Sequence, residues 1–189
     1  MIDNTTAFLV DQLNRFLATR VTGKGPHVVL GSPVSPDGPV TLDITDKVVV
    51  TLLNIEREYV AANTSNAYTK HSGGIARSAP PLNLNLILLI SANYPSSYET
   101  GLKLLSAILA FFQGHPIFNR QNAPTLPQSL KRLTFEWQDM NLQTAHNMWA
   151  GLGGKYLPCA IYKARMLIFE DAWLGDDVPL ITGTKVETN

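Results

Sequence analysis

Few residues in this sequence have the types and spacing that catalysis requires. Cys159 is the only cysteine, and it follows Pro158 at the start of an apolar segment. No charged neighbour in the sequence would lower its pKa, so Cys159 is predicted to be a small buried hydrophobic residue rather than a nucleophile. The histidines are scattered without metal-ligand spacing, at His27, His71, His115 and His146.

The sequence also lacks a motif for phosphate binding and a pair of carboxylates suited to acid–base catalysis. Gly23-Lys24-Gly25 and Gly153-Gly154-Lys155 both lack the Gly-x-x-x-x-Gly-Lys-Ser/Thr spacing of a phosphate-binding loop. Asp176-Asp177 is an adjacent pair in a polar C-terminal segment, where two carboxylates would have no fixed geometry for proton transfer. The sequence therefore predicts a protein that is not an enzyme and that uses no cofactor and no metal.

The composition is that of one ordinary globular domain. The chain has 189 residues, of which 45% are hydrophobic, enough for a substantial core. Its 15 basic and 15 acidic residues give a net charge of zero, which favours neither nucleic acid nor an anionic membrane as partner and does not oppose self-association. With a single cysteine, no signal-peptide pattern and no apolar run of about 20 residues, we expect cytoplasmic assembly.

The segment 80–114 has the strongest pattern and predicts a central strand followed by a long helix. Apolar residues alternate along one face of the strand, at Leu82, Leu84, Leu86, Leu88 and Ile90. Ser96 and Glu99 have the spacing of a capping box at the start of the helix. Apolar residues then recur at helical spacing as far as Gly114, so this strand and helix are expected to form the core.

Further elements follow from the same patterns. Strands are predicted at 27–30, 47–60, 133–138 and 159–169. A first helix is predicted to run to about Arg20, and a third to begin after Asn141. The third helix is expected to bury Leu142, Ala145, Trp149 and Leu152. The prediction is a single α+β domain over 1–170, with a mixed, mainly antiparallel sheet packed against one long and two shorter helices, and a flexible tail over 171–189.

Two polar segments are candidates for contact with partners. Segment 61–79 is rich in Asn, Thr, Ser and Gly, and we interpret it as a long loop at the tip of a hairpin, with a basic tip formed by Lys70, His71 and Arg77. In the tail, Val178, Leu180 and Ile181 have strand-forming character and are expected to add to an exposed sheet edge. A third irregular segment, 116–127, is interpreted as a connection.

Several blocks of sequence, in order along the chain, resemble one known family. They are Phe8 to Asn14, Val48 to Glu56, Pro80 to Tyr94, Leu133 to Glu136, Asn147 to Pro158 and Ile161 to Met166. Together these blocks are similar to the cap, or tube-terminator, protein of extracellular contractile injection systems, which are phage-tail-like particles. The resemblance implies a fold like that of phage tail terminators and a structural protein that forms a hexameric ring on the distal end of the inner tube and sheath.

The resemblance also implies the partners: other copies of the chain, tube protein and sheath protein, in a particle that can be released from the cell. Two alternatives from other classes stay open at this point. One is a small-molecule or peptide binding module that uses segment 61–79 as a lid. The other is a hydrolase that uses Cys159 with a histidine, which would require an exposed thiol of low pKa.

Overall fold

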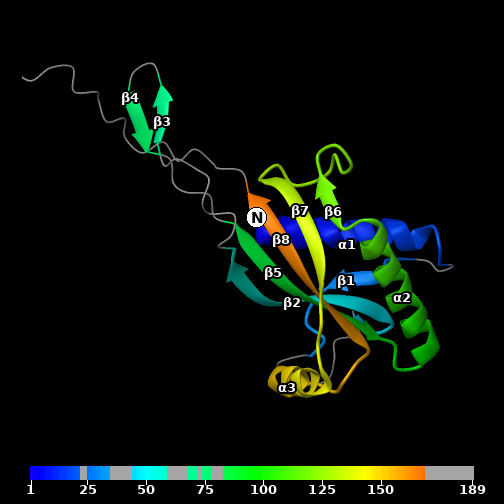
Figure 1. The fold of residues 1–189 in the computed structure, drawn as a ribbon. Helices are drawn as coiled ribbons and strands as arrows, with labels where there is room; N and C mark the ends of the chain where they lie inside the picture. Colours follow the sequence, from blue (N-terminus) through cyan, green and yellow to red (C-terminus); the bar gives the residue numbers. More distant parts are fainter. Residues whose placement is uncertain (22–24, 35–43, 59–67, 72–73, 78–82, 169–189) are drawn as a thin grey trace, which may run out of the picture.

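The computed structural model describes residues 1–21, 25–34, 44–58, 68–71, 74–77 and 83–168. Within these ranges the chain forms three helices and eight strands (Figure 1). The helices are α1 (Ile2–Ala18), α2 (Tyr98–Gly114) and α3 (Leu142–Leu152). The strands are β1 (Val28–Leu30), β2 (Lys47–Arg57), β3 (Tyr68–His71), β4 (Gly74–Arg77), β5 (Leu84–Asn93), β6 (Ile117–Asn119), β7 (Leu130–Gln138) and β8 (Cys159–Ile168). None of these helices is long and apolar enough to cross a membrane.

Six of the strands form one sheet, in the order β1-β2-β5-β8-β7-β6, and β3 pairs with β4 in a separate sheet. β1 is parallel to β2, and the other pairs are antiparallel. β2 and β5 pair from Lys47↔Asn93 to Arg57↔Leu84, with a bulge between Leu52 and Asn54. This pairing confirms that the strands on either side of 61–79 are antiparallel neighbours. The mixed, mainly antiparallel sheet and the α+β class are confirmed as well.

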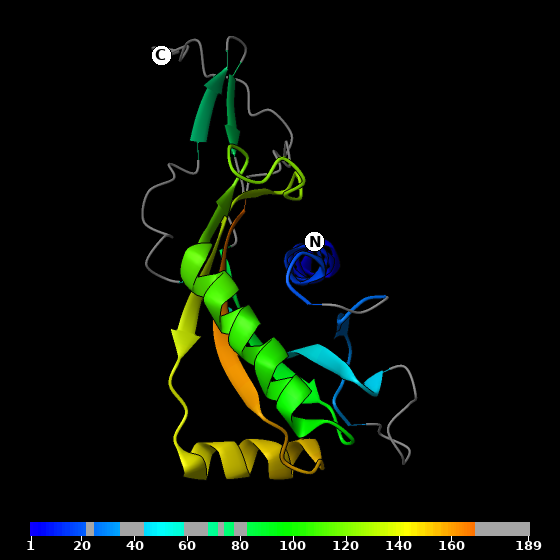
Figure 2. The ribbon, with the colours of Figure 1, turned by 90° about the vertical axis from the view of Figure 1, so that its right-hand side faces the viewer.

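Helices α1 and α2 cover one face of the six-stranded sheet (Figure 2). The alternating residues Leu86, Leu88 and Ile90 of β5 are buried together in the main core, as their spacing predicts. The two helices contribute Phe8, Leu9, Leu13, Leu17, Leu104, Leu105, Ile108, Phe111 and Phe112 to the same core. One apolar stripe from each helix therefore closes over the alternating face of the sheet.

The opposite face of the sheet is apolar at one end. Val49 and Leu89 alternate with the core-facing residues of β2 and β5, and both are fully buried. At this end α3 joins β7 to β8 (Figure 2), and its buried Trp149 lies beside the Cys159 thiol of β8. Cys159 pairs with Ser91, and Ser91 with Val49, so α3 covers this end of the face.

The start of α2 differs from the predicted capping box. The N-cap is Ser97 rather than Ser96, and its side chain makes no capping hydrogen bond to the backbone. Instead the hydroxyl oxygens of Ser97 and Thr100 lie 2.6 Å apart and share a hydrogen bond. Glu99 pairs with Lys103 at 2.7 Å, one turn further along the helix. The capping-box prediction was wrong because a nearby lysine at i+4 competes for the carboxylate.

Several strands and one helix also differ from prediction. The irregular connection predicted at 116–127 contains β6, and the strand predicted at 133–138 begins earlier, at Leu130. Segment 61–79, predicted to be a loop, contains the paired strands β3 and β4. The first helix is no shorter than the second, since α1 and α2 each have 17 residues. The missed strands share a cause: strands of three or four residues carry too little alternation to be recognised.

The third helix begins at its predicted N-cap, and its predicted inner face is confirmed at Ala145 and Trp149, which are buried, while Leu152 is half-buried. Asn141 is the N-cap, and its side-chain oxygen accepts a hydrogen bond of 2.8 Å from the Thr144 amide. Gly153 ends the helix in the left-handed conformation, with φ +73°. Leu142, predicted to be buried, is 89% exposed. It is the first residue of the helix, ahead of the buried stripe of Ala145 and Trp149.

Candidate assembly surface

The thiol of Cys159 lacks the properties of a nucleophile. Cys159 lies half-buried at the start of β8. Burial raises the pKa of this thiol, and the neighbouring indole of Trp149 offsets only part of the effect. A catalytic cysteine needs the opposite shift, toward the thiolate. In the described part of the chain, no three His, Cys, Asp or Glu residues are grouped as a metal site would require.

The residues predicted to contact partners lie in two places. Lys70 and His71 lie in β3, and Arg77 lies in β4 on the neighbouring strand. Arg77 pairs with Tyr68, and Lys70 pairs with Ile75, so the hairpin brings the three basic positions onto one two-stranded unit. This unit lies beyond the end of the main sheet at which β5 begins and β8 ends (Figure 1). The tail residues Val178, Leu180 and Ile181 lie outside the described residues.

Charged side chains occupy the other half of the sheet face that α3 leaves open. Lys163 of β8 lies 3.4 Å from the carboxylate of Glu56 in β2. Arg165, two residues further along β8, lies 2.9 Å from Glu136 of β7 and 3.6 Å from Glu58. The cross-strand pairing dictates this network, because Glu136 is opposite Lys163 and the residues on one face alternate along each strand. This half of the face is therefore polar and suited to water or to a polar partner.

An aromatic groove lies on the helix-covered face, between α2 and the edge of the sheet at β7. Its volume is about 400 Å³. It is lined by Leu109, Phe112, Gln113, Pro116, Phe135, Trp137 and Tyr162. The rings of Phe112 and Tyr162 stack with centroids 4.1 Å apart, and the Trp137 ring packs edge-on against Tyr162 at 5.5 Å. Burial raises the pKa of Tyr162 to about 12, in keeping with its apolar surroundings.

The exposure of Trp137 makes this groove a candidate surface for contact with a partner. Half of its side chain (50%) is exposed, and its indole N–H donates a hydrogen bond of 2.9 Å to Asp139. Tryptophan is enriched in protein interfaces because it buries a large apolar area while keeping one polar group satisfied. A partner side chain entering the groove would cover Trp137 without leaving a buried donor unpaired.

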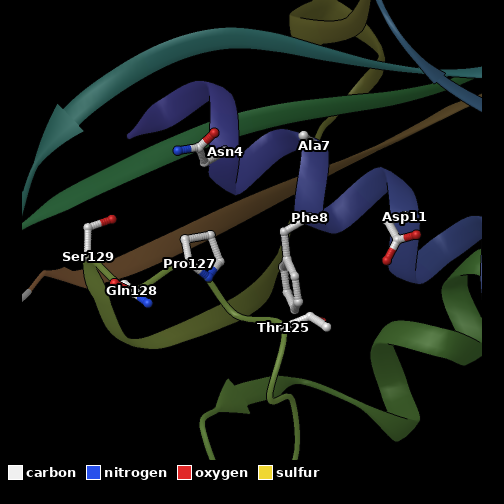
Figure 3. A pocket seen from close by; sticks show the side chains of 8 residues that line it. All are labelled: Asn4, Ala7, Phe8, Asp11, Thr125, Pro127, Gln128 and Ser129. Carbon is white, nitrogen blue, oxygen red and sulfur yellow. The ribbon is translucent and has the colours of Figure 1, made fainter.

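A second groove, of about 590 Å³, lies between α1 and segment 125–129 (Figure 3). Asn4, Ala7, Phe8, Asp11, Thr125, Pro127, Gln128 and Ser129 line it. The Phe8 ring points from α1 toward segment 125–129, and Asp11, the charged side chain in the lining, is already paired with Arg15 at 2.9 Å. The lining of this groove therefore mixes polar and apolar side chains, and its carboxylate, that of Asp11, is engaged in an ion pair.

The sequence shows individual residues of these surfaces but not how the fold brings them together. The charged residues of β2 and β8 can be seen in the sequence, but which of them form ion pairs depends on the order of the strands. The aromatic groove was missed because its residues come from α2, the segment before β6, β7 and β8. Trp137 is the signal that could have indicated the groove, because it is a large aromatic residue in a strand where apolar and polar residues alternate.

The comparisons with known proteins match nearly the whole chain rather than one site. A family model described as the Pvc16 N-terminal domain matches residues 4–182. The cryo-EM structure of a PVC sheath/tube terminator in the extended state, from an extracellular contractile injection system, is similar with a TM-score of 0.58 at 15% sequence identity. That match covers 100% of this chain and 64% of the other.

The cryo-EM structure of the anti-feeding prophage cap, a tube-terminating cap, is similar with a TM-score of 0.56 at 15% identity. That match covers 95% of this chain and 60% of the cap chain. The chain therefore spans less than two thirds of the length of either matched structure. Comparison with curated proteins found no match. The two structures share the fold, and the family model covers nearly the full length; the chain belongs to the Pvc16 N-terminal domain family.

Proposed function

We propose that the chain is a structural cap that ends the inner tube and sheath of a contractile injection particle. The observation that carries this proposal is the family match over residues 4–182, together with a fold shared with two tube terminators. The raised pKa of Cys159 also favours a structural role over the hydrolase alternative. Assembly would take place in the cytoplasm, in a particle later released from the cell.

The cap would act as a homohexameric ring. Closed rings are built from heterologous interfaces, in which one patch on each subunit docks onto a different patch of the next. A net charge of zero places no overall repulsion between copies. Ring formation on the end of the tube would add contacts to the layer below, so the isolated protein is expected to assemble more weakly than the protein on a tube.

The test is to mix the purified protein with purified tubes and image the product by negative-stain electron microscopy. We expect extra density at one end of each tube, and tubes that stop elongating when the protein is present. Light scattering should give a ring mass six times the monomer mass of 20.7 kDa. Tubes that elongate unchanged and carry no bound protein would rule out the cap.

The hairpin β3–β4 is proposed to contact the tube or a neighbouring subunit through Lys70, His71 and Arg77. Replacing residues 61–79 by a tight turn should leave the thermal midpoint within a few degrees, because β3 and β4 pair with each other and not with the main sheet. Tube binding should weaken. The matched variant Lys70→Glu with Arg77→Glu keeps the length and tests the charge alone. Undiminished tube binding by both variants would contradict the proposal.

The tail is proposed to attach the cap to the sheath as a separate unit after the domain at 1–170. Val178, Leu180 and Ile181 would add as a strand to an exposed sheet edge, with Pro179 on the side that donates no hydrogen bond. Deleting residues 174–189 should leave the melting temperature and ring formation unchanged but reduce retention on purified particles. A large loss of thermal stability would show instead that the tail packs on its own domain.

A further inference from the structure

Among the described residues, both edges of the six-stranded sheet are only partly paired with another strand. At one edge, β1 pairs with Val48 to Val50 of β2, and the Gly31 amide donates the last hydrogen bond, 3.1 Å, to the Val50 carbonyl. Beyond this point β2 continues to Arg57, and no strand among the described residues pairs with that side. At the other edge, β6 pairs with Arg132 to Thr134 of β7, and β7 continues past it.

Half-exposed apolar side chains lie at both edges, and on the same face of the sheet. Ile55 of β2 is 45% exposed and pairs with Leu86, a residue of the main core. Trp137 of β7 is 50% exposed and pairs with Tyr162, also a core residue. Since directly paired residues project from the same face, one edge presents an aliphatic side chain and the other presents the aromatic groove on that face.

The two features also lie at the same level along the strands. Ile55 pairs with Leu86, Leu86 with Ala164, and Ala164 with Phe135, which lines the groove. The Phe135 amide donates a hydrogen bond of 2.8 Å to the Pro116 carbonyl, which places Pro116 level with Phe135. If the neighbouring sheet continues in this register, the level is kept from one copy to the next. Ile55 of one copy would therefore arrive beside Pro116 and Phe135 of the next.

Strand direction permits the sheets to join. β1 is parallel to β2, and successive antiparallel pairs from β2 through β5, β8 and β7 leave β6 parallel to β2 as well. A neighbour's β6 laid against the open part of β2 would therefore run in the same direction as β1 and continue its line along the strand. None of the residues that line the groove carries a charge, and its polar groups belong to Gln113, Trp137 and Tyr162.

From these observations we propose that copies of this chain join edge to edge. The open part of β2 receives the neighbour's β6, and Ile55 packs into the groove between Pro116, Phe135 and Trp137. The occupant of the groove is thus a second copy of the chain, which supplies the aliphatic side chain that the groove lacks. The proposal rests on the ring described under Proposed function and assigns its subunit interface.

Cysteine cross-linking tests this contact directly. In a Cys159→Ala background, Ile55→Cys and Pro116→Cys are combined in one chain, and the protein is oxidised with and without purified tubes. Neighbouring strands lie about 4.8 Å apart, which is within the range of Cα separations that a disulfide spans. Because each subunit carries both partners, we expect a ladder of covalent oligomers larger than dimers. Each single variant should give dimers at most. The matched control combines Ile55→Cys with Leu142→Cys, whose leucine is 89% exposed but lies on α3 away from both edges.

The outcomes separate this interface from the cap itself. Protein that assembles by light scattering but gives no ladder above the control would overturn the edge contact and leave the cap standing. Protein that stays monomeric with and without tubes would overturn both. If the thiol introduced by Ile55→Cys reacts with maleimide only after residues 174–189 are deleted, the chain's own tail occupies the β2 edge, and the proposal fails. As an independent readout, Trp137→Ala should weaken self-association about 30-fold, as expected for a tryptophan central to an interface.

Discussion

Replacing Phe112 by alanine is expected to lower the free energy of unfolding by about 3–5 kcal/mol. Phe112 is 3% exposed and lies where α2 meets the sheet. Its ring stacks on Tyr162 at 4.1 Å and packs against Phe135 at 4.9 Å and Phe111 at 5.4 Å. Alanine would remove these contacts and leave a cavity beneath the aromatic groove. For a domain whose total stability is about 5–15 kcal/mol, the loss is a large fraction.

Trp137 provides the matched control, because it lines the same groove but is half exposed. Trp137→Ala should cost only about 1–2 kcal/mol, since much of its apolar area is already in contact with water. Urea denaturation of both variants gives the two free energies. The order should reverse for self-association, where Trp137 is expected to matter more than its stability effect suggests. Equal losses of stability would mean that Phe112 is not the anchor between helix and sheet.

The central layer of the fold could be predicted from sequence because its signals are local. The alternation through Leu86, Leu88 and Ile90 determines which face of β5 meets the helices, and the structure buries all three. The stripe of α2 and its end at Gly114 follow from helical spacing in the same way. In α3, the N-cap at Asn141 was predictable because its side chain bonds to the Thr144 amide, only three residues further along the chain.

Three local patterns were ambiguous or too short to interpret. Ser96 and Ser97 are adjacent candidates for the N-cap, and in the structure the N-cap is Ser97, whose hydroxyl shares a hydrogen bond with Thr100. In β3 and β4, four residues each give no clear period, so the pairing from Tyr68↔Arg77 to His71↔Gly74 was not recognised. Leu142 was placed inward by helical spacing alone, which does not determine where the buried stripe begins.

The assembly surface was less predictable because it depends on which strands become neighbours. The ion pairs of Arg165 join β8 to Glu136 of β7 and to Glu58, the residue that follows β2. The aromatic groove requires α2 to lie over β8 and β7. Among the described strands, parts of the two sheet edges stay unpaired because β1 and β6 have only three residues each. Each property is set by strand order, and strand order is not encoded in any single segment.

The other large effect is expected at Asn14, which connects α1 to the edge strand β1. The Asn14 side-chain oxygen accepts hydrogen bonds from the His27 amide at 2.9 Å and the Val28 amide at 3.0 Å. Its side-chain nitrogen donates to the Val28 carbonyl at 2.8 Å. One side chain thus satisfies three backbone groups at the start of a three-residue strand. Among the described strands, β1 pairs with β2 alone, on its other side.

Asn14→Ala should lower the free energy of unfolding by about 2 kcal/mol. Three hydrogen bonds at about 1 kcal/mol each would be lost. The higher helix propensity of alanine returns about 0.6 kcal/mol of this. Gln12→Ala, at a partly exposed position of the same helix, should change stability by less than about 0.5 kcal/mol. The local effect should exceed the global one: amide exchange at Val28 and Gly31 should accelerate more than exchange at Leu88 in the central strand. Unchanged exchange at Val28 would show that pairing with β2 alone holds β1 in place. In that case the end of β1, which sets where the open edge of β2 begins, would not depend on the helix.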